Sequence, residues 1–492
     1  MIRKTKFLPL ALLVACSAFS RDEYTRNFDK TIAVSSGARV LLEHKFGDIV
    51  IRTHPGQDVN IHAEIRVSAS DAQQAKDFAD HVEILVEPSS ELSIRTRYPE
   101  VRRSIFGLHD VSFSVHYELT VPETSPLEVR NSFGSVSVTG VRANSEIVNS
   151  HGELVFHDGR GYQHLANSFA RIEVLNNQGD VTVETNNGAV EVSDVAGRLV
   201  VRDRFANVTV ARVTKGVSVT NSNGTVQVTD SGGVGEIRNS FGNVSARNFR
   251  GDLTINTTNG AVEADNVEGS ADLNTTFGAV RFTGIGKEAS IRANNSKIEG
   301  SHVGSGLAVV NSFGPVIVSD VGRDARVESG NGSVTIEKVG GSVNIRTSFG
   351  AVQATNIGGG LSVQDSNGSV HASNVKGAQV ATSFGSVTLD GVSGAVEIQN
   401  QNGAVEASST LRGGCEPIAI RTSFSTLRVH LQSDASYKVL AKTSFGKIRT
   451  DFPLSVSGSI SDDDVDGVIG GGRCEMRLTD NNGPIEILKS SQ

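Results

Sequence analysis

The stretch from Asn131 to Asn149, NSFGSVSVTGVRANSEIVN, returns in altered copies through most of the chain. Each copy has a polar pair, a Phe or Asn, a small marker residue (usually Gly) and then two aliphatic residues in V-x-V spacing. From Gly134 to Gly403 the marker returns at fifteen intervals, fourteen of 18 residues and one of 17. A strict period of this length is typical of a solenoid, in which each repeat is one circuit of the chain.

One repeat, from Gly188 to Phe205, shows what a circuit contains. Val190 and Val192 alternate with polar residues in its first half, and the second half carries another such pair. Alternating β-branched residues predict two short strands per repeat. Two such strands cannot bury an apolar face alone, but coils stacked about 4.8 Å apart can. The equal spacing therefore predicts an all-β parallel β-helix, or β-solenoid, of 18-residue coils in register.

The residue before the marker alternates between large and small, which gives a period of two coils. We interpret these residues as turn and core side chains, in which a compact Asn makes room for the ring in the next coil. Asn also tolerates the left-handed backbone that such a turn often needs. The alternative is a ligand-binding row of Phe and Asn. The aromatic positions are Phe133, Phe169, Phe205, Phe241, Phe277, Phe313, Phe349 and Phe384.

The N-terminus predicts export. Residues 1–15 have a basic start and an apolar run, Phe7–Val14, as in a lipoprotein signal peptide. The following Cys16 completes a Leu-Val-Ala-Cys lipobox and would be acylated, which anchors a protein without spanning the membrane. The alternative is an ordinary secretory signal cut somewhat later. Polar residues 16–30 are predicted to be a tether. We expect a protein anchored by lipid in the cell envelope, at the outer membrane or its periplasmic face.

The flanks of the repeat are less regular. Residues 31–130 predict a β region that caps one end of the stack, with one helix over 70–82. That helix begins at a capping box made by Ser70 and Gln73. Residues 131–410 form the regular solenoid, and residues 411–492 form irregular C-terminal coils and a cap. Within the C-terminal part, the Gly- and Asp-rich insert Leu454–Arg473 predicts a loop.

Composition excludes some classes of function. The 492 residues include 52 Gly and no Trp, and the formal charge is −8, which suits a repetitive β protein. No basic patch with interleaved aromatic residues appears, so a nucleic-acid partner is not expected. Besides Cys16 the chain has Cys415 and Cys474. An even number in an exported protein predicts a disulfide across the C-terminal region.

Metal and catalytic patterns are weak. Asp462, Asp464 and Asp466 precede Gly467 as in the first half of a calcium loop, but the closing position is Arg473 instead of Glu. A solvated acidic loop is the preferred interpretation, and no cofactor is predicted. The repeat also lacks the recurring Asp of calcium-binding rolls. No nucleophile elbow or phosphate-binding loop appears, so no catalytic residue is assigned.

Three stretches together resemble the bacterial putative-adhesin family, exported β-helical proteins also known as a domain of unknown function. They are the NSFG, TSFG and NNG steps, the entry VHYELTVPETSPLEVRNSFGSVSV, and the C-terminal runs FGKIRTDFPLSVSG and GVIGGGRCEMRLTDNNGPIEIL. The resemblance covers nearly the whole mature chain. It implies surface adhesion, and it assigns no functional residues because the family has no established site.

Three functions follow as hypotheses. The first is a non-enzymatic scaffold for adhesion, with the membrane as one partner through the N-terminal lipid and a cell-surface glycan or protein as another. The second is a carbohydrate-active β-helix enzyme, which needs two carboxylates facing each other in a cleft. The third is a structural filament that assembles end to end. A face of Ser, Thr and Asn side chains would favour the scaffold.

Overall fold

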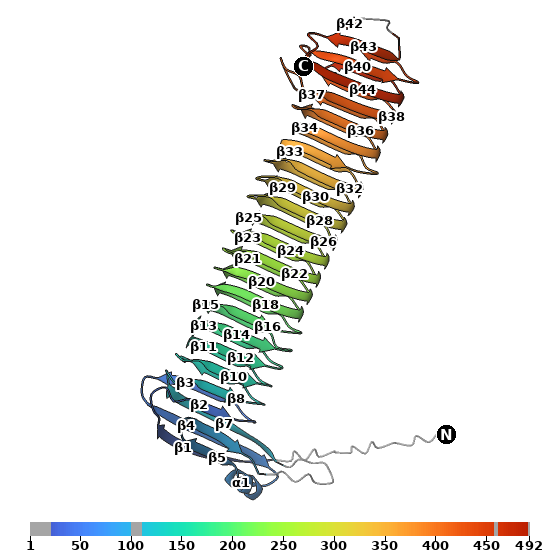
Figure 1. Ribbon diagram of the computed structural model, residues 1–492. Coiled ribbons are helices and arrows are strands. Elements are labelled where there is room, and N and C mark those ends of the chain that lie inside the picture. Colours follow the sequence, from blue (N-terminus) through green and yellow to red (C-terminus); the bar gives the residue numbers. More distant parts are fainter. Residues whose placement is uncertain (1–20, 100–110, 457–460, 491–492) are drawn as a thin grey trace, which may run out of the picture. The chain divides into compact units, whose positions relative to one another are not determined.

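The computed structural model describes residues 21–99, 111–456 and 461–490 (Figure 1). They form a nearly all-β chain of 45 strands with one α-helix, divided into two compact units, Met1–Arg160 and Gly161–Gln492. The predicted signal peptide, Cys16 and the start of the predicted tether lie outside the described residues. Within the described part of the chain, no helix combines the length and the apolar character that crossing a membrane requires.

The second unit is a parallel β-solenoid. Strand β15 (Val190–Val195) pairs in parallel with β17 (Val208–Val213), so that Val190 lies opposite Val208. The same step carries β16 (Leu199–Arg202) onto β18 (Gly216–Asn223). Each coil thus adds one strand to each of two parallel sheets. The predicted fold class, with coils of 18 residues in parallel register, is confirmed.

Aliphatic columns from both sheets fill the inside of the coils. Val190, Val192 and Leu199 are at most 3% exposed. Where a ring enters the core, the adjoining coil holds a small residue: Phe282 is 1% exposed and lies opposite Gly300. A Cβ atom on Gly300 would lie 2.0 Å from the Phe282 ring. We expected a large and a small residue to alternate between adjoining coils along the Phe and Asn row. In the core, Phe282 and Gly300 show this arrangement.

A left-handed residue ends the first strand of most coils in the second unit. Asp194, Arg212 and Asp230 have φ values of 59°, 54° and 59°. This conformation shifts the in–out alternation of the strand by one residue. Val195, which simple alternation from Val192 would place outside, therefore points inward. The Asn residues of the Phe and Asn row are not among the described residues with positive φ. Their predicted left-handed role is therefore wrong.

The first unit contains early copies of the coil and a cap. Strands β2 (Val40–Glu43) and β3 (Ile49–His54) pair in parallel with β8 (Leu127–Arg130) and β9 (Val136–Thr139). Strand β7 (Ser112–Pro122) pairs with the other edge of β3. Strand β6 (Leu92–Arg97) pairs in parallel with the other edge of β2. Strand β5 (Glu83–Pro88) pairs antiparallel with β6.

Two antiparallel strands extend this cap. Strand β4 (Asp58–Ala69) pairs with β7, and β1 (Asp22–Ala33) pairs with β4. Residues 22–30 were predicted to be tether, and the structure corrects this. Tyr24, Arg26, Phe28 and Ile32 lie on one side of β1 and are half-buried, while the other residues of the strand are exposed. The many charges on the exposed side hid this strand pattern in the sequence.

The single helix, α1 (Ala72–Asp80), lies within the predicted range but is shorter at both ends. Its N-cap is Asp71, whose carboxylate accepts a hydrogen bond from the Gln74 backbone nitrogen at 2.9 Å. The predicted capping box on Ser70 is therefore wrong by one residue, because the Asp side chain serves as the cap. Ala75 and Ala79 are buried on the face that packs against β1 and β4.

The C-terminal strands enter the stack out of chain order. Strand β44 (Cys474–Asn482) lies between β38 (Ile418–Phe424) and β40 (Tyr437–Thr443) and runs parallel to both. The chain therefore leaves a gap one coil wide after β38, builds β40, and returns to fill the gap. Strand β45 (Ile485–Lys489) fills the matching place between β39 (Leu427–Leu431) and β41 (Ile448–Thr450).

An antiparallel pair follows β40 at this end. Strand β43 (Asp464–Ile469) runs antiparallel to β40, and β42 (Ser455–Val456) runs antiparallel to β43. The loop predicted for Leu454–Arg473 thus contains the two strands β42 and β43. Val465 and Ile469 are buried on one side of β43, while Asp464 and Asp466 are exposed on the other. The Asp and Gly content masked this alternation.

Candidate binding surface

The recurring Phe side chains lie on the surface, which overturns their interpretation as core residues. In the second unit they range from 48% exposed at Phe277 to 60% at Phe205, and Phe133 in the first unit is 43% exposed. The inward alternation of Leu199 and Val201 ends at the buried Asp203. Because the chain turns a corner there, the next aromatic residue points into solvent.

Phe and Asn follow one another from coil to coil in register. Phe313 lies opposite Asn331, and Asn331 lies opposite Phe349. Asn367 then lies between Phe349 and Phe384, and Asn402 lies between Phe384 and Phe424. We call these seven residues the Phe/Asn ladder. Successive rings are two coils apart, or about 10 Å at ordinary strand spacing.

A column of buried polar side chains lies two residues before the ladder and shapes the corner. Asn311 donates from Nδ2 to the carbonyl oxygens of Ser296, in the preceding coil, at 2.8 Å and of Gly314 at 3.1 Å. Sequence reasoning missed this column, although an Asn, Thr, Ser or Asp two residues before almost every Phe or Asn of the row could have revealed it; Ala293 is an exception. Its members in the second unit are Asn167, Thr185, Asp203, Asn221, Asn239, Thr257, Thr275, Asn311, Ser329, Thr347, Asp365, Thr382, Asn400, Thr422, Thr443 and Asp480.

Three members of this column are acids. Burial raises the pKa of Asp203, Asp365 and Asp480 above the usual range of the residue. Each carboxylate accepts a backbone N–H hydrogen bond at the corner, such as that from Asn367 to Asp365 at 3.2 Å. These bonds partly offset the cost of burying a charged group. The three acids act as caps of their corners.

A polar groove follows the Phe/Asn ladder. It consists of two adjoining hollows of about 750 and 420 Å³, which share Arg346 and Thr347 as lining residues. We call this the ladder groove. One side is formed by outward side chains of the strands, such as Gln364 and Gln399, and the other by ladder residues. Hydroxyl, amide and guanidinium groups dominate the lining, as expected for the scaffold hypothesis.

The charges along the ladder groove are unevenly engaged. Arg346 donates from Nε to Gln364 at 3.2 Å and lies 3.9 Å from the carboxylate of Glu328. Glu328 also accepts hydrogen bonds from Arg326, and this contact holds the pKa of Glu328 below its usual range. Arg421, by contrast, has no side-chain partner among the described residues. The groove therefore offers one free cation to a ligand.

A second hollow, of about 940 Å³, follows a different corner of the coils. Gly306, Gly360 and Gly377 lie at this corner, and the aliphatic side chains of Leu307 and Leu361 line it. The three glycines place no side chain over this corner, but Leu307 and Leu361 remain at most 4% exposed. This hollow is mainly apolar, in contrast to the ladder groove.

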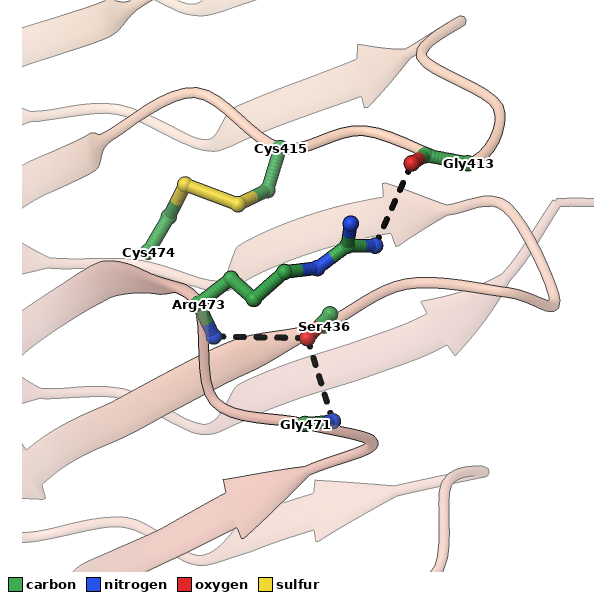
Figure 2. The surroundings of a disulfide bond; sticks show 6 residues. All are labelled: Gly413, Cys415, Ser436, Gly471, Arg473 and Cys474. Atoms are coloured by element: carbon green, nitrogen blue, oxygen red, sulfur yellow. Dashed lines mark hydrogen bonds between the residues drawn. A yellow bond between two sulfur atoms is a disulfide. The ribbon is translucent and has the colours of Figure 1, made fainter.

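The predicted disulfide joins Cys415 to Cys474 in the structure (Figure 2). It links the segment before β38 to the first residue of β44, the strand that fills the gap in the stack. Nearby, Arg473 donates to the carbonyl oxygen of Gly413 at 3.2 Å. The hydroxyl oxygen of Ser436 accepts hydrogen bonds from the backbone nitrogens of Gly471 and Arg473. The entry of the last coil is thus fastened by several contacts.

The acidic run proposed as half of a calcium loop does not wrap around a central point. Asp464 and Asp466 lie on one side of the extended strand β43. Asp464 pairs with Lys442 at 3.1 Å, and Asp462 pairs with Lys447 at 3.1 Å. Among the described residues, no group of three His, Cys, Asp or Glu side chains is arranged to hold a metal ion. The geometry favours the solvated acidic segment.

Comparison with known proteins adds little to this picture. A scan against models of protein families gives no match, and a search of curated proteins gives none. Among solved structures, the chain is similar to the crystal structure of a putative cell adhesion protein from Clostridium sporogenes. The sequence identity is 11% and the TM-score 0.22, over 45% of this chain and 100% of that one. At these values the likeness carries no argument about function.

Proposed function

We propose that the chain is an exported adhesion scaffold of the putative-adhesin type, anchored by lipid in the cell envelope and without catalytic activity. The observation that carries this proposal is the Phe/Asn ladder, whose rings are about half exposed on alternate coils. Exposed aromatic side chains that recur along one line mark interaction sites, because their contact with water is unfavourable. A stack of rigid coils holds such side chains at fixed spacing, as adhesion to an extended partner requires.

Export and anchoring rest on the N-terminal sequence. The lipobox places Cys16 where a lipid would be attached, and the Cys415–Cys474 disulfide suits an oxidising compartment. The full chain should therefore fractionate with membranes. The Cys16→Ser variant should be found in the soluble fraction, since one Cys carries the anchor. Membrane association of the Cys16→Ser variant would contradict the lipid anchor. The adhesion proposal does not depend on this result and has a separate test.

The adhesion proposal is tested by binding of the Cys16→Ser chain to native cell-envelope material in a pull-down assay. Substitution of Phe349, Phe384 and Phe424 by Ala should reduce binding at least tenfold. Substitution of the matched set Phe169, Phe205 and Phe241 measures how far the surface extends outside the ladder groove. Circular dichroism should show that both variants keep the β-sheet signal. Absence of binding by the unaltered chain would overturn the proposal.

One observation favours an enzyme as the second candidate. Glu328 and Asp365 both line the ladder groove, and their pKa values are shifted in opposite directions, by hydrogen bonding and by burial. Acid–base hydrolysis uses two carboxyl groups whose pKa values differ in this way, but Glu328 and Asp365 line different hollows of the groove. Against this, Asp365 caps its corner as Asp480 does elsewhere. Cleavage of a polysaccharide by the purified chain, lost in the Asp365→Asn variant, would establish the enzyme.

A further inference from the structure

The ladder groove combines two kinds of recognition chemistry. Phe424 lines it, and Phe349 and Phe384, which are also about half exposed, directly follow the lining residues Ser348 and Ser383. Its lining also includes Ser383, Gln401 and other small polar side chains. A ligand that fits both must have apolar faces and many hydroxyl groups along its edges. Pyranose sugars have this character, because their axial C–H bonds form an apolar face while the equatorial hydroxyls point outward.

The spacing of the rings narrows the class of sugar. Two rings are separated by two coils, about 10 Å, with one Asn side chain between them. A chain of β1,4-linked pyranoses is a flat, extended ribbon that repeats every two sugar units, over a comparable length. An α1,4-linked chain coils and cannot present the same face at each step. The ladder therefore matches an extended β1,4-linked chain that lies along the stacking direction of the coils.

The backbone of the groove disfavours a peptide ligand. Strand β32 (Val343–Phe349) pairs on both edges, with β30 (Ala325–Asn331) and β33 (Val352–Gln364). Strand β36 (Val396–Asn402) likewise pairs with β34 (Val370–Phe384) and with β38. A peptide that adds to a sheet needs a free strand edge. A sugar needs only side chains.

Unengaged side chains are present at the right places. In the described part of the chain, Arg421, Gln401 and Ser383 have no side-chain hydrogen-bond partner. Asp365 is only 7% exposed, lines the groove, and has one carboxylate oxygen without a partner. A buried polar atom of this kind is costly unless something hydrogen-bonds to it. Sugar hydroxyls both donate and accept, so they can satisfy Arg421, Gln401 and Ser383, whereas the unpartnered oxygen of Asp365 is closed to solvent like those of Asp203 and Asp480.

We propose that the ladder groove binds an extended β1,4-linked polysaccharide, with sugar faces on Phe349, Phe384 and Phe424 and hydroxyls on the polar lining. This inference rests on the proposed adhesion function and names the ligand class of its surface. Glucose-based and N-acetylglucosamine-based chains share the required geometry, and the experiment separates them.

The test is calorimetric titration of the full-length Cys16→Ser chain with cellohexaose, chitohexaose and maltohexaose. We expect saturable binding of at least one β1,4-linked hexasaccharide and none of α1,4-linked maltohexaose. The Phe349→Ala, Phe384→Ala, Phe424→Ala variant should lose at least tenfold in affinity, whereas the variant of Phe169, Phe205 and Phe241 should stay within about twofold of the unaltered chain. The heats with cellohexaose and chitohexaose tell which sugar is preferred.

Failure of both β1,4-linked hexasaccharides to bind, or equal binding of maltohexaose, would overturn the inference. So would unchanged affinity in the groove variant once circular dichroism shows it folded. The pull-down assay separates this result from the adhesion proposal. Binding to envelope material without binding to a hexasaccharide would contradict the β1,4-linked ligand and support the adhesion function. Binding to a hexasaccharide without binding to envelope material would support the sugar site and contradict the adhesion function.

Discussion

The side-chain nitrogen of Asn239 donates a hydrogen bond to the carbonyl oxygen of Gly224, one coil earlier, at 3.0 Å. The same nitrogen lies 3.0 Å from the carbonyl oxygen of Gly242 in its own coil. One amide thus satisfies two backbone acceptors at a corner where the strand ladder has ended. Because this arrangement recurs at Asn311 and Asn400, the buried polar column joins neighbouring coils at the base of the Phe/Asn ladder.

Replacing Asn239 by Ala should therefore destabilise the solenoid. Two part-buried carbonyl oxygens would lose their donor, at a cost of about 1–3 kcal/mol. Urea unfolding followed by circular dichroism measures the change in unfolding free energy. Asn294→Ala is the matched control, because Asn294 is exposed and its side chain makes no hydrogen bond among the described residues. Equal effects of the two substitutions would contradict the role of the column.

The fit between Phe282 and Gly300 makes a second prediction. Gly300→Val should cost about 1–3 kcal/mol, since the new side chain meets a ring that is packed on all sides. Phe282→Val should offset much of this cost in the double variant, because two Val residues in adjoining coils already occur at Val190 and Val208. A double-mutant cycle by urea unfolding should give a coupling energy well above its error. Additive effects would show that the two residues do not compete for space.

The buried acids predict a pH dependence. A carboxyl whose pKa is raised in the folded chain is harder to ionise there than in the unfolded chain, where its pKa is about 3.9. Below that pH, Asp203 is protonated in both states and does not lower the unfolding free energy. As the pH rises through its folded pKa, burial of the charged carboxylate lowers the unfolding free energy. Asp203→Asn should raise the unfolding midpoint at pH 7 and leave it nearly unchanged at pH 3.

The control for this prediction is Asp390→Asn, because Asp390 is exposed and has no side-chain partner in the described part of the chain. It should alter stability little at either pH. A gain from Asp203→Asn that is equally large at pH 3 would point to the new amide donor as its cause. In that case burial of the charge would not be the source of the effect.

The disulfide should stabilise mainly the last coils. Its two cysteines are 59 residues apart. For a loop of this length, the chain-entropy model predicts that the disulfide raises the unfolding free energy by about 4 kcal/mol. In a stack whose coils contact only their neighbours, the effect should stay local. In the Cys415→Ser, Cys474→Ser variant, hydrogen exchange should accelerate in β40 and β44 and remain unchanged in β15 to β18. Uniform acceleration, or none, would contradict this account.

The sequence predicts the fold better than the surface. The 18-residue period and the alternation of residues such as Val190 and Val192 are enough to specify stacked parallel coils, because only in-register stacking buries every copy. The position of Phe205 could not be predicted in this way. Simple alternation from Val201 through Asp203 places its ring inside, and only the turn at the corner brings it to the surface.

Two further features depend on contacts that no local pattern records. Strand β1 was missed because its polar face resembles a tether, and its pairing with β4 lies far away in sequence. The out-of-order entry of β44 between β38 and β40 follows from which edges remain unpaired once β40 has formed. The cysteine pair was predictable because Cys415 and Cys474 are the two cysteines of the chain besides Cys16, which leaves one pairing.

The central claim is that each 18-residue copy adds one layer to a parallel stack. Distances between spin labels at exposed positions of one column test it most directly: Thr209 paired in turn with Arg281, Ile317 and Gln353, which are four, six and eight copies away. At about 4.8 Å per layer, double electron–electron resonance should give about 19, 29 and 38 Å. Distances that fail to grow in proportion to the number of copies would contradict the stack.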